Sequence, residues 1–170
     1  ADLAAEGYAL VAAFEPEFTL GRRVPGDGPD APDRLAPVDQ SLCFSTSGFG
    51  AAHDYALELV RALQAQGLVV EQYYPELGHG QQELSIRHAP AVKAADNQVT
   101  YRQTVRAIAA QHGMVGSLAP KPWADQAGSG SHLHWSIWNE SHTQNRLADA
   151  GAQGGLSELG RHAVAGVLAD

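Results

Sequence analysis

Residues 68–88 have the sequence LVVEQYYPELGHGQQELSIRH, which reads as two strands separated by a turn. The first part, residues 68–77, is rich in Val and Tyr, which are common in strands. Residues 78–81, GHGQ, contain two glycines that permit a tight change of direction. Residues 82–88 read as a returning strand. The sequence therefore predicts a β-hairpin in this part of the chain.

Long helices are predicted on either side of this hairpin. Residues 50–66 carry Tyr55, Leu59 and Leu63 at helical spacing, and the segment ends at Gly67, a residue type that often terminates helices. Two further helices are predicted over residues 90–112 and 156–168.

Three other segments favour strands: residues 8–20, 114–122 and 130–140. Residues 21–40 are rich in Pro and Gly, so we expect a long loop there. Hairpins alternating with long helices, without regular βαβ spacing, predict an α+β fold in which helices back an antiparallel sheet. At 170 residues, the chain has the length of a single domain, which we expect to span residues 1–170.

The composition limits the kinds of partner. The chain has 44% hydrophobic and 18% charged residues, which is typical of a globular protein, and it lacks an apolar run long enough to span a bilayer. Its formal net charge of -8, with only 11 Lys and Arg residues, argues against a nucleic-acid-binding surface. We therefore expect neither a nucleic-acid nor a membrane partner. The single cysteine, Cys43, fits a cytoplasmic location and is expected to be a small buried side chain.

Two glutamates in the first predicted strand indicate a charged site. Glu15 and Glu17 flank Pro16, and their spacing places both carboxylates on one face of the strand. Like charges this close repel each other, and a divalent cation is the usual way to neutralise them. The alternative is a pair of exposed glutamates on an edge strand.

The predicted hairpin carries three more glutamates, Glu71, Glu76 and Glu83. We expect Glu76 and Glu83 to face each other across the turn. Like charges on opposed strand positions are destabilising unless something binds them, so this pair favours a metal site. A hairpin with solvent-exposed glutamates is the alternative.

The stretch AGSGSHLHWSIW, residues 127–138, places His132, His134 and Ser136 on one face of another predicted strand. His132 can supply a neutral nitrogen ligand, whereas His134 and Ser136 are suited to hydrogen-bonding phosphate or ribose oxygens. Because glutamates dominate the candidate ligands, the sequence favours Mg²⁺ or Mn²⁺ over a structural zinc site.

The order of these motifs resembles that of the catalytic domain of the glutamine synthetase superfamily. The resemblance covers nearly the whole chain, and its specificity comes from several separated motifs that agree in order and spacing. The motifs are EPEF (15–18), EQYYPELGHGQQE (71–83), KAADNQVTYRQTVRAIAAQHG (93–113), APKP (119–122) and GSGSHLHWS (128–136). The resemblance implies a curved antiparallel sheet backed by long helices, of which this chain is a part.

The resemblance also implies roles for the candidate residues. One metal, which activates the amino-acid carboxylate, would be bound by Glu17, Glu76 and Glu83. A second metal, near the nucleotide phosphates, would be bound by Glu15 and His132. The resemblance further assigns ATP contacts to Glu71, His134 and Ser136, and a place in the glutamate pocket to Gly128.

The reaction implied by the resemblance is an ATP-dependent ligation with Mg²⁺ or Mn²⁺. The side-chain carboxylate of L-glutamate attacks the terminal phosphate of ATP, and ammonia or an amine then displaces phosphate from the γ-glutamyl phosphate. Ammonia-using relatives typically carry Asn where this chain has Ala127, which raises the alternative of a larger amine such as a polyamine or ethanolamine. The resemblance implies a homo-oligomeric parent protein.

The superfamily's subunits are much longer than this chain, and its 170 residues match only their middle. We therefore expect the isolated chain to have little or no activity. Two other classes remain open at this stage: a non-catalytic relative that binds metal, nucleotide or amino acid, and a metal-dependent hydrolase that uses the same carboxylates.

Overall fold

The computed structural model describes residues 3–28 and 30–169. By contacts between residues, the chain divides into two compact units that share its longest strands. One unit contains residues 14–87 and 95–133, and the other contains residues up to 13, 88–94 and from 134 onward. Organisation as a single domain stays a prediction. None of the helices in the described ranges is both long and apolar enough to cross a membrane.

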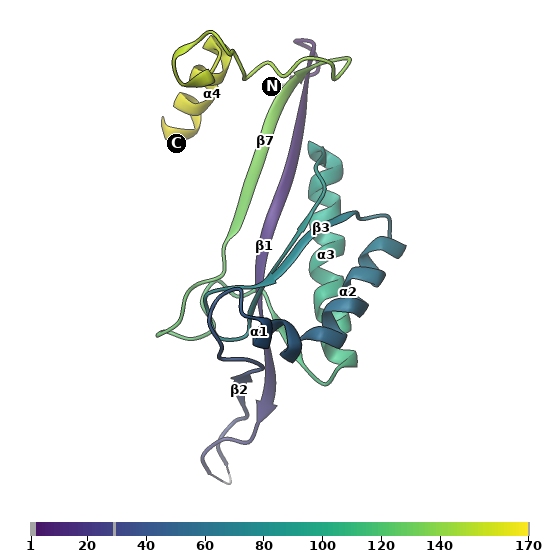
Figure 1. Ribbon diagram of the computed structural model, residues 1–170, viewed down its shortest axis with the longest axis vertical. Helices are drawn as coiled ribbons and strands as arrows, with labels where there is room; N and C mark the ends of the chain where they lie inside the picture. Colours follow the sequence, from purple (N-terminus) through teal and green to yellow (C-terminus); the bar gives the residue numbers. More distant parts are fainter. Residues whose placement is uncertain (1–2, 29, 170) are drawn as a thin grey trace. The chain divides into compact units, whose positions relative to one another are not determined.

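The sheet is organised around one long strand, β1, which runs from Tyr8 to Val24 (Figure 1). Its 17 residues are about three times the length of an ordinary strand, so several short strands pair with it at successive positions. All of the registers described along β1 are antiparallel. Its partners are β5 (Ala89–Pro90) at Val11–Ala12, β4 (Gln81–Ile86) at Glu17–Thr19, β6 (Val115–Ser117) at Thr19–Gly21, and β2 (Arg34–Pro37) at Gly21–Val24.

The predicted hairpin is confirmed. Strand β3 (Val70–Pro75) pairs antiparallel with β4, and Gly80 in the connecting turn has φ = +66°, a conformation that favours glycine. Every residue of β4 is buried, because the strand lies between β1 and β3. The seventh strand, β7 (Ser131–Asn139), also pairs with β1 and confirms the strand predicted over residues 130–140.

The predicted helices are also confirmed. The first divides into α1 (Thr46–Ala51) and α2 (His53–Ala65), because Ala52 leaves helical geometry between them. The others are α3 (Ala91–Gln111) and α4 (Glu158–Ala169), with a short 3-10 turn, η1 (Gln153–Gly155), before α4. Both Gly67 and Gly113 have positive φ where helices end, as the helix-termination signals predict.

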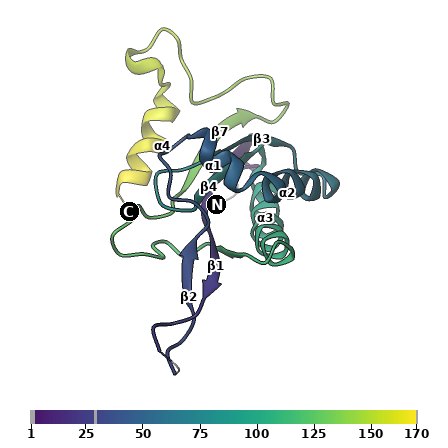
Figure 2. The same ribbon diagram turned by 60° about the horizontal axis from the view of Figure 1, so that its bottom comes forward.

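The core of the unit containing β4 lies between the strands and the helices α2 and α3, which stand on one side of the sheet (Figures 1 and 2). Phe18 of β1 is fully buried there, with edge-on contacts to Tyr55 of α2 and Tyr101 of α3 at ring-centre distances of 6.2 and 6.3 Å. The arrangement confirms the predicted α+β class and its curved antiparallel sheet backed by long helices. Because side chains alternate along β1, Glu17 next to Phe18 points away from the helices.

One prediction about local structure needs correction. Residues 21–40 do not form a plain loop, because β1 continues to Val24 and pairs with β2 in a hairpin. The Pro and Gly residues correctly predicted a connection, but the short strand β2 that follows it was not predicted. Pro16 is buried and precedes the part of β1 that pairs with β4. Its carbonyl accepts a hydrogen bond from the Tyr101 hydroxyl at 3.3 Å, which links this part of β1 to α3.

Candidate functional site

A row of three polar side chains crosses the sheet on the face opposite the helices. Glu83 of β4 pairs in register with Glu17 of β1 on one side and with Tyr74 of β3 on the other. Directly opposed residues on neighbouring strands have their Cβ atoms close together. Strand pairing therefore places two carboxylates and a phenol in one line.

Glu83 is the most buried member of this row, with 4% of its surface exposed. Burial raises the pKa of its carboxyl group, and a hydrogen bond from the Tyr74 hydroxyl opposes that rise. The charges of Glu15, Glu76 and Glu17 raise the pKa further. Four of the predicted metal-binding carboxylates are therefore close enough to influence one another electrostatically.

Glu17 is held by a glutamine that the sequence reasoning missed. The Gln81 side-chain amide donates to Glu17 Oε2 at 2.6 Å and to the Gly128 carbonyl at 2.9 Å. The Glu17 N–H donates to the Gly130 carbonyl at 3.0 Å. The glycine-rich segment before β7 is thus fixed beside the acidic row. The alternation of Gln81 with Glu83 along β4 is the signal that could have predicted this placement.

Glu76 does not face Glu83, and that prediction is wrong. Tyr74 is the residue of β3 that pairs with Glu83, and the Glu76 N–H donates to the Gln81 carbonyl at 2.8 Å. The turn lies where the sequence predicts it, but the two strands pair in a different register. Glu76 therefore lies two residues beyond the position opposite Glu83.

The carboxylate of Glu76 accepts a hydrogen bond from the Leu77 N–H at 2.8 Å and lies 3.8 Å from the Cys43 sulfur. Cys43 is half-buried, not fully buried as the sequence suggested. Burial, followed by the charge of Glu76, raises the pKa of the thiol. No signal near Cys43 in the sequence could have predicted this neighbour, which comes from a segment more than thirty residues away.

Glu15 and His132 lie near each other, as the resemblance implies, with Glu15 Oε2 3.9 Å from His132 Nδ1. The His132 side chain is 69% exposed. β1 and β7 supply the two residues, so strand pairing brings together positions more than a hundred residues apart in the chain.

Of the five predicted ligands, Glu15 and His132 approach each other, whereas Glu17, Glu76 and Glu83 have different hydrogen-bond partners. Within residues 3–28 and 30–169, no group of three or more His, Cys, Asp or Glu side chains converges closely enough to hold a metal ion. The chemistry of the set, four carboxylates and one imidazole, suits a hard divalent cation such as Mg²⁺ or Mn²⁺.

Glu71 lies apart from the acidic row. It sits at an irregularity in the β3–β4 pairing, between Val70 and Gln72, and its carboxylate accepts from Arg87 Nε at 2.5 Å. Both side chains are about half exposed. The ATP contact implied for Glu71 stays a prediction, and the structure adds Arg87 as its ion-pair partner.

The other unit contains the remaining two predicted nucleotide-binding residues. His134 and Ser136 of β7 line a pocket of about 340 Å³ together with His88 and Trp138. The Trp138 indole donates to Ser136 Oγ at 2.8 Å. A nucleotide role for His134 and Ser136 stays a prediction.

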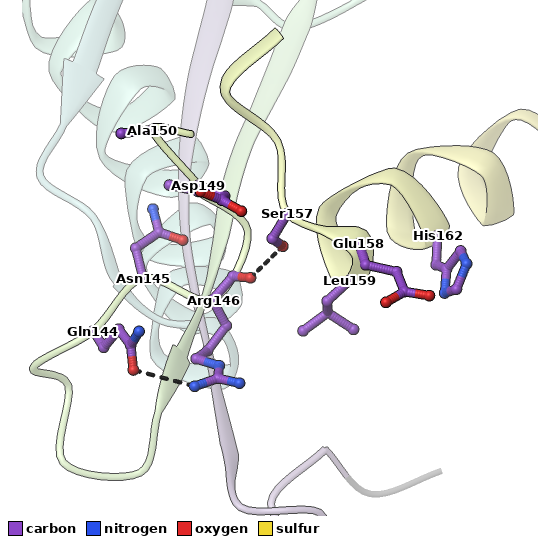
Figure 3. Close-up of a pocket in the computed structure, with 10 residues that line it drawn as sticks. Gln144, Asn145, Arg146, Asp149, Ala150, Ser157, Glu158, Leu159 and His162 are labelled. Carbon is purple, nitrogen blue, oxygen red and sulfur yellow. Dashed lines mark hydrogen bonds between the residues drawn. The ribbon is translucent and has the colours of Figure 1, made fainter. Parts of the chain in front are cut away.

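A larger hollow of about 730 Å³ lies in the same unit, between the loop after β7 and the start of α4 (Figure 3). The Ser157 hydroxyl donates to the Arg146 carbonyl at 2.6 Å, and the Arg146 guanidinium donates to Gln144. Asp149, Glu158 and His162 also line this hollow. None of the residues selected from the sequence lies here.

Comparison with known proteins identifies the family. The model of the glutamine synthetase catalytic domain matches residues 1–170. A gamma-glutamylpolyamine synthetase from Streptomyces coelicolor is 36% identical over 162 residues, which cover 95% of this chain and 33% of that protein. A glutamate–isopropylamine ligase from a Pseudomonas species is 33% identical over 165 residues, covering 96% of this chain and 36% of the ligase.

Solved structures agree with the sequence comparisons. A crystal structure described as a novel glutamine synthase homolog superposes with a TM-score of 0.85 at 35% identity, over 98% of this chain and 36% of that one. The ligand-free structure of GmaS gives a TM-score of 0.77 at 27% identity, over 91% of this chain and 35% of that one. The chain thus spans about one third of the length of the proteins it matches. From the matched motifs, the fold and these comparisons together, the chain belongs to the glutamine synthetase catalytic-domain family, a family of glutamate–ammonia and glutamate–amine ligases.

Proposed function

We propose that the complete protein joins ammonia or an amine to the side-chain carboxylate of L-glutamate, with ATP as the co-substrate and γ-glutamyl phosphate as the intermediate. The observation that carries this proposal is the acidic row, in which buried Glu83 lies between Glu17 and Tyr74 and is influenced by Glu15 and Glu76. Such a concentration of carboxylates on one sheet face suits a reaction that handles phosphates through divalent cations.

Two divalent cations, Mg²⁺ or Mn²⁺, are part of this proposal. Glu17, Glu76 and Glu83 would bind one of them, and Glu15 with His132 would contribute to the other. When bound, these cations neutralise phosphoryl oxygens and make the terminal phosphate of ATP easier to transfer. The chain's own contribution is to supply these side chains, with Gln81 hydrogen-bonded to Glu17 and Tyr74 hydrogen-bonded to Glu83.

Gly128 is proposed to line the glutamate pocket. A side chain there would place its Cβ only 2.8 Å from the Pro120 carbonyl oxygen, so the backbone path excludes larger residues. The Gly128 carbonyl is fixed by Gln81, which also holds Glu17. For ATP, we propose contacts from Glu71, His134 and Ser136, of which His134 and Ser136 line one pocket.

The acceptor is either ammonia or a larger amine, and two observations raise the alternative of an amine. The relatives named above act, by their names, on a polyamine and on isopropylamine. By the resemblance, Ala127 also stands where ammonia-using members typically carry Asn. Because this chain spans about a third of its relatives, we expect the isolated 170 residues to have little or no activity. The resemblance to the family separately implies that the complete protein is a homo-oligomer.

Phosphate release by the complete protein tests the proposal. The assay supplies MgATP and L-glutamate and compares ammonia with polyamines, isopropylamine and ethanolamine. We expect release that depends on glutamate and is stimulated by one acceptor, and mass spectrometry should then identify the corresponding γ-glutamyl product. Binding of MgATP and glutamate without release for any acceptor would support the alternative, a non-catalytic binding relative. Hydrolysis of an amide or ester bond in the absence of ATP would support a metal-dependent hydrolase.

A further inference from the structure

Two consecutive tyrosines of β3 make hydrogen bonds on opposite faces of the sheet. Tyr73 points to the core face, where its hydroxyl donates to Gln82 Oε1 at 2.6 Å. Tyr74 points to the acidic face, where its hydroxyl donates to Glu83 Oε1. Successive side chains of a strand alternate in this way. The hairpin therefore contains a matched pair of phenol hydrogen bonds, only one of which touches a predicted metal ligand.

The orientation of Tyr74 is fixed from two sides. Its position in β3 pairs in register with Glu83, and its ring contacts Phe44 edge-on at a ring-centre distance of 5.2 Å. Phe44 is anchored in turn, because its N–H donates to the Pro75 carbonyl at 3.1 Å. A phenol held by the strand and by an aromatic neighbour can direct its hydroxyl at one oxygen.

The Tyr74 phenol is a hydrogen-bond donor to the Glu83 carboxylate. In the described ranges of the chain, Tyr74 is the one side chain that donates a hydrogen bond to Glu83. Glu83 is almost completely buried, and a buried carboxylate without a donor would be costly. The hydrogen bond from Tyr74 is directed at Oε1, one of the two carboxylate oxygens of Glu83.

We propose that Tyr74 is a positioning residue that holds the Glu83 carboxylate in the orientation in which it binds a divalent cation. This inference rests on the proposed function, in which Glu83 is a metal ligand. Hydrogen-bond partners of metal ligands fix the ligand's orientation, and their loss typically weakens metal binding by about 10- to 100-fold. We expect an effect in that range when the Tyr74 hydroxyl is removed.

The test compares three variants of the complete protein, Tyr74→Phe, Tyr73→Phe and Glu83→Gln, by Mn²⁺ titration followed by electron paramagnetic resonance. Tyr74→Phe keeps the ring and its contact with Phe44 but loses the hydroxyl. We expect its Mn²⁺ affinity to fall by about 10- to 100-fold. Tyr73→Phe loses the equivalent hydroxyl on the core face and should bind Mn²⁺ as the unmodified protein does.

A second readout reports directly on the phenol. Mn²⁺ binding should change the near-ultraviolet absorbance of Tyr74, because the charge on its acceptor is partly neutralised. This difference spectrum should persist in Tyr73→Phe and disappear in Tyr74→Phe. Persistence of the change in Tyr74→Phe would show that it arises from another aromatic residue and would contradict the contact between Tyr74 and a metal ligand.

The possible failures are distinguishable. If Tyr74→Phe retains full affinity while Glu83→Gln loses it, Glu83 remains a metal ligand and the positioning role of Tyr74 is wrong. Equal losses in both tyrosine variants would mean general destabilisation and would also overturn that role. Full affinity in Glu83→Gln would overturn the proposed metal role of Glu83, and the inference about Tyr74 with it.

Discussion

The Gln81 side-chain amide lies 2.6 Å from Glu17 Oε2 and also contacts the Gly128 carbonyl, so one buried group links β1, β4 and the segment before β7. A single polar side chain thereby connects a predicted metal ligand to the predicted glutamate pocket. Mutation of Gln81 can separate the contribution of this side chain to stability and metal binding from that of the sheet.

Replacing Gln81 with Ala should lower the free energy of unfolding by about 1–3 kcal/mol, because Glu17 and Gly128 lose a buried donor. It should also weaken Mn²⁺ binding by the complete protein, since Glu17 is no longer held. Denaturant unfolding and Mn²⁺ titration measure the two effects. The control is Gln72→Ala at an exposed position of β3, where we expect a change within about 0.5 kcal/mol. Equal effects of the two variants would contradict the proposed link.

Replacing Gly128 with Ala should raise KM for glutamate by about tenfold, equivalent to ~1.4 kcal/mol. The added Cβ would lie 2.8 Å from the Pro120 carbonyl oxygen, so the loop backbone has to shift. Steady-state kinetics of the complete protein measure the effect. Gly28→Ala is the control, because nothing lies within 4 Å of its added Cβ. An unchanged KM in Gly128→Ala would exclude this glycine from the glutamate pocket.

The stability of the core beside helix α2 should depend on Leu59. Leu59→Ala should lower the free energy of unfolding by about 2–5 kcal/mol, because it removes buried methyl groups and leaves a cavity. Leu57, in the same helix, is 43% exposed, and Leu57→Ala should cost much less. Chemical denaturation of the two variants tests the difference. Comparable losses would show that the α2 face is assigned incorrectly.

Tyr55 should make the protein sensitive to alkali. Burial raises its pKa well above the ordinary value, which is about 10, and its hydroxyl donates to the Val105 carbonyl at 3.3 Å. Because the folded state holds this proton more tightly than the unfolded state, the contribution is complete below pH ~10 and is lost as the pH rises toward the folded pKa.

The variant Tyr55→Phe should therefore lose less stability than the unmodified protein between neutral pH and pH values above about 10. Thermal unfolding at a series of pH values measures this slope, and tyrosinate absorbance reports the titration. The half-buried Tyr8 provides the comparison, through Tyr8→Phe. An identical alkaline slope in Tyr55→Phe and the unmodified protein would show that this phenol does not control the transition.

Local patterns predicted most of the secondary structure. The helices over 50–66 and 90–112 and the hairpin over 68–88 follow from periodicity and glycine placement, and each is present within a few residues. The short strand β2 was not predicted, because its four residues, RLAP, carry little strand signal. Its pairing with the extended end of β1 stabilises it instead, and such a long-range partner leaves no local trace.

In the candidate site, too, local patterns predicted some features and missed others. Alternation along a strand was sufficient to place Glu15 and Glu17 together, and both influence Glu83. Alternation could not give the register of the hairpin, so it placed Glu76 opposite Glu83 where Tyr74 lies. The approach of Cys43 to Glu76 depends on the path of a separate segment, which no local pattern encodes.

The sequence by itself determined which segments are strands and helices, because periodicity and turn residues act over a few neighbouring positions, and it determined the family through the order of its motifs. Only the tertiary structure decided which side chains meet. Strand register sets those encounters, and a shift of one or two residues, which local energies hardly distinguish, changes every partner across the sheet. Tyr74 and Gln81 emerged as the groups that hold Glu83 and Glu17 for this reason.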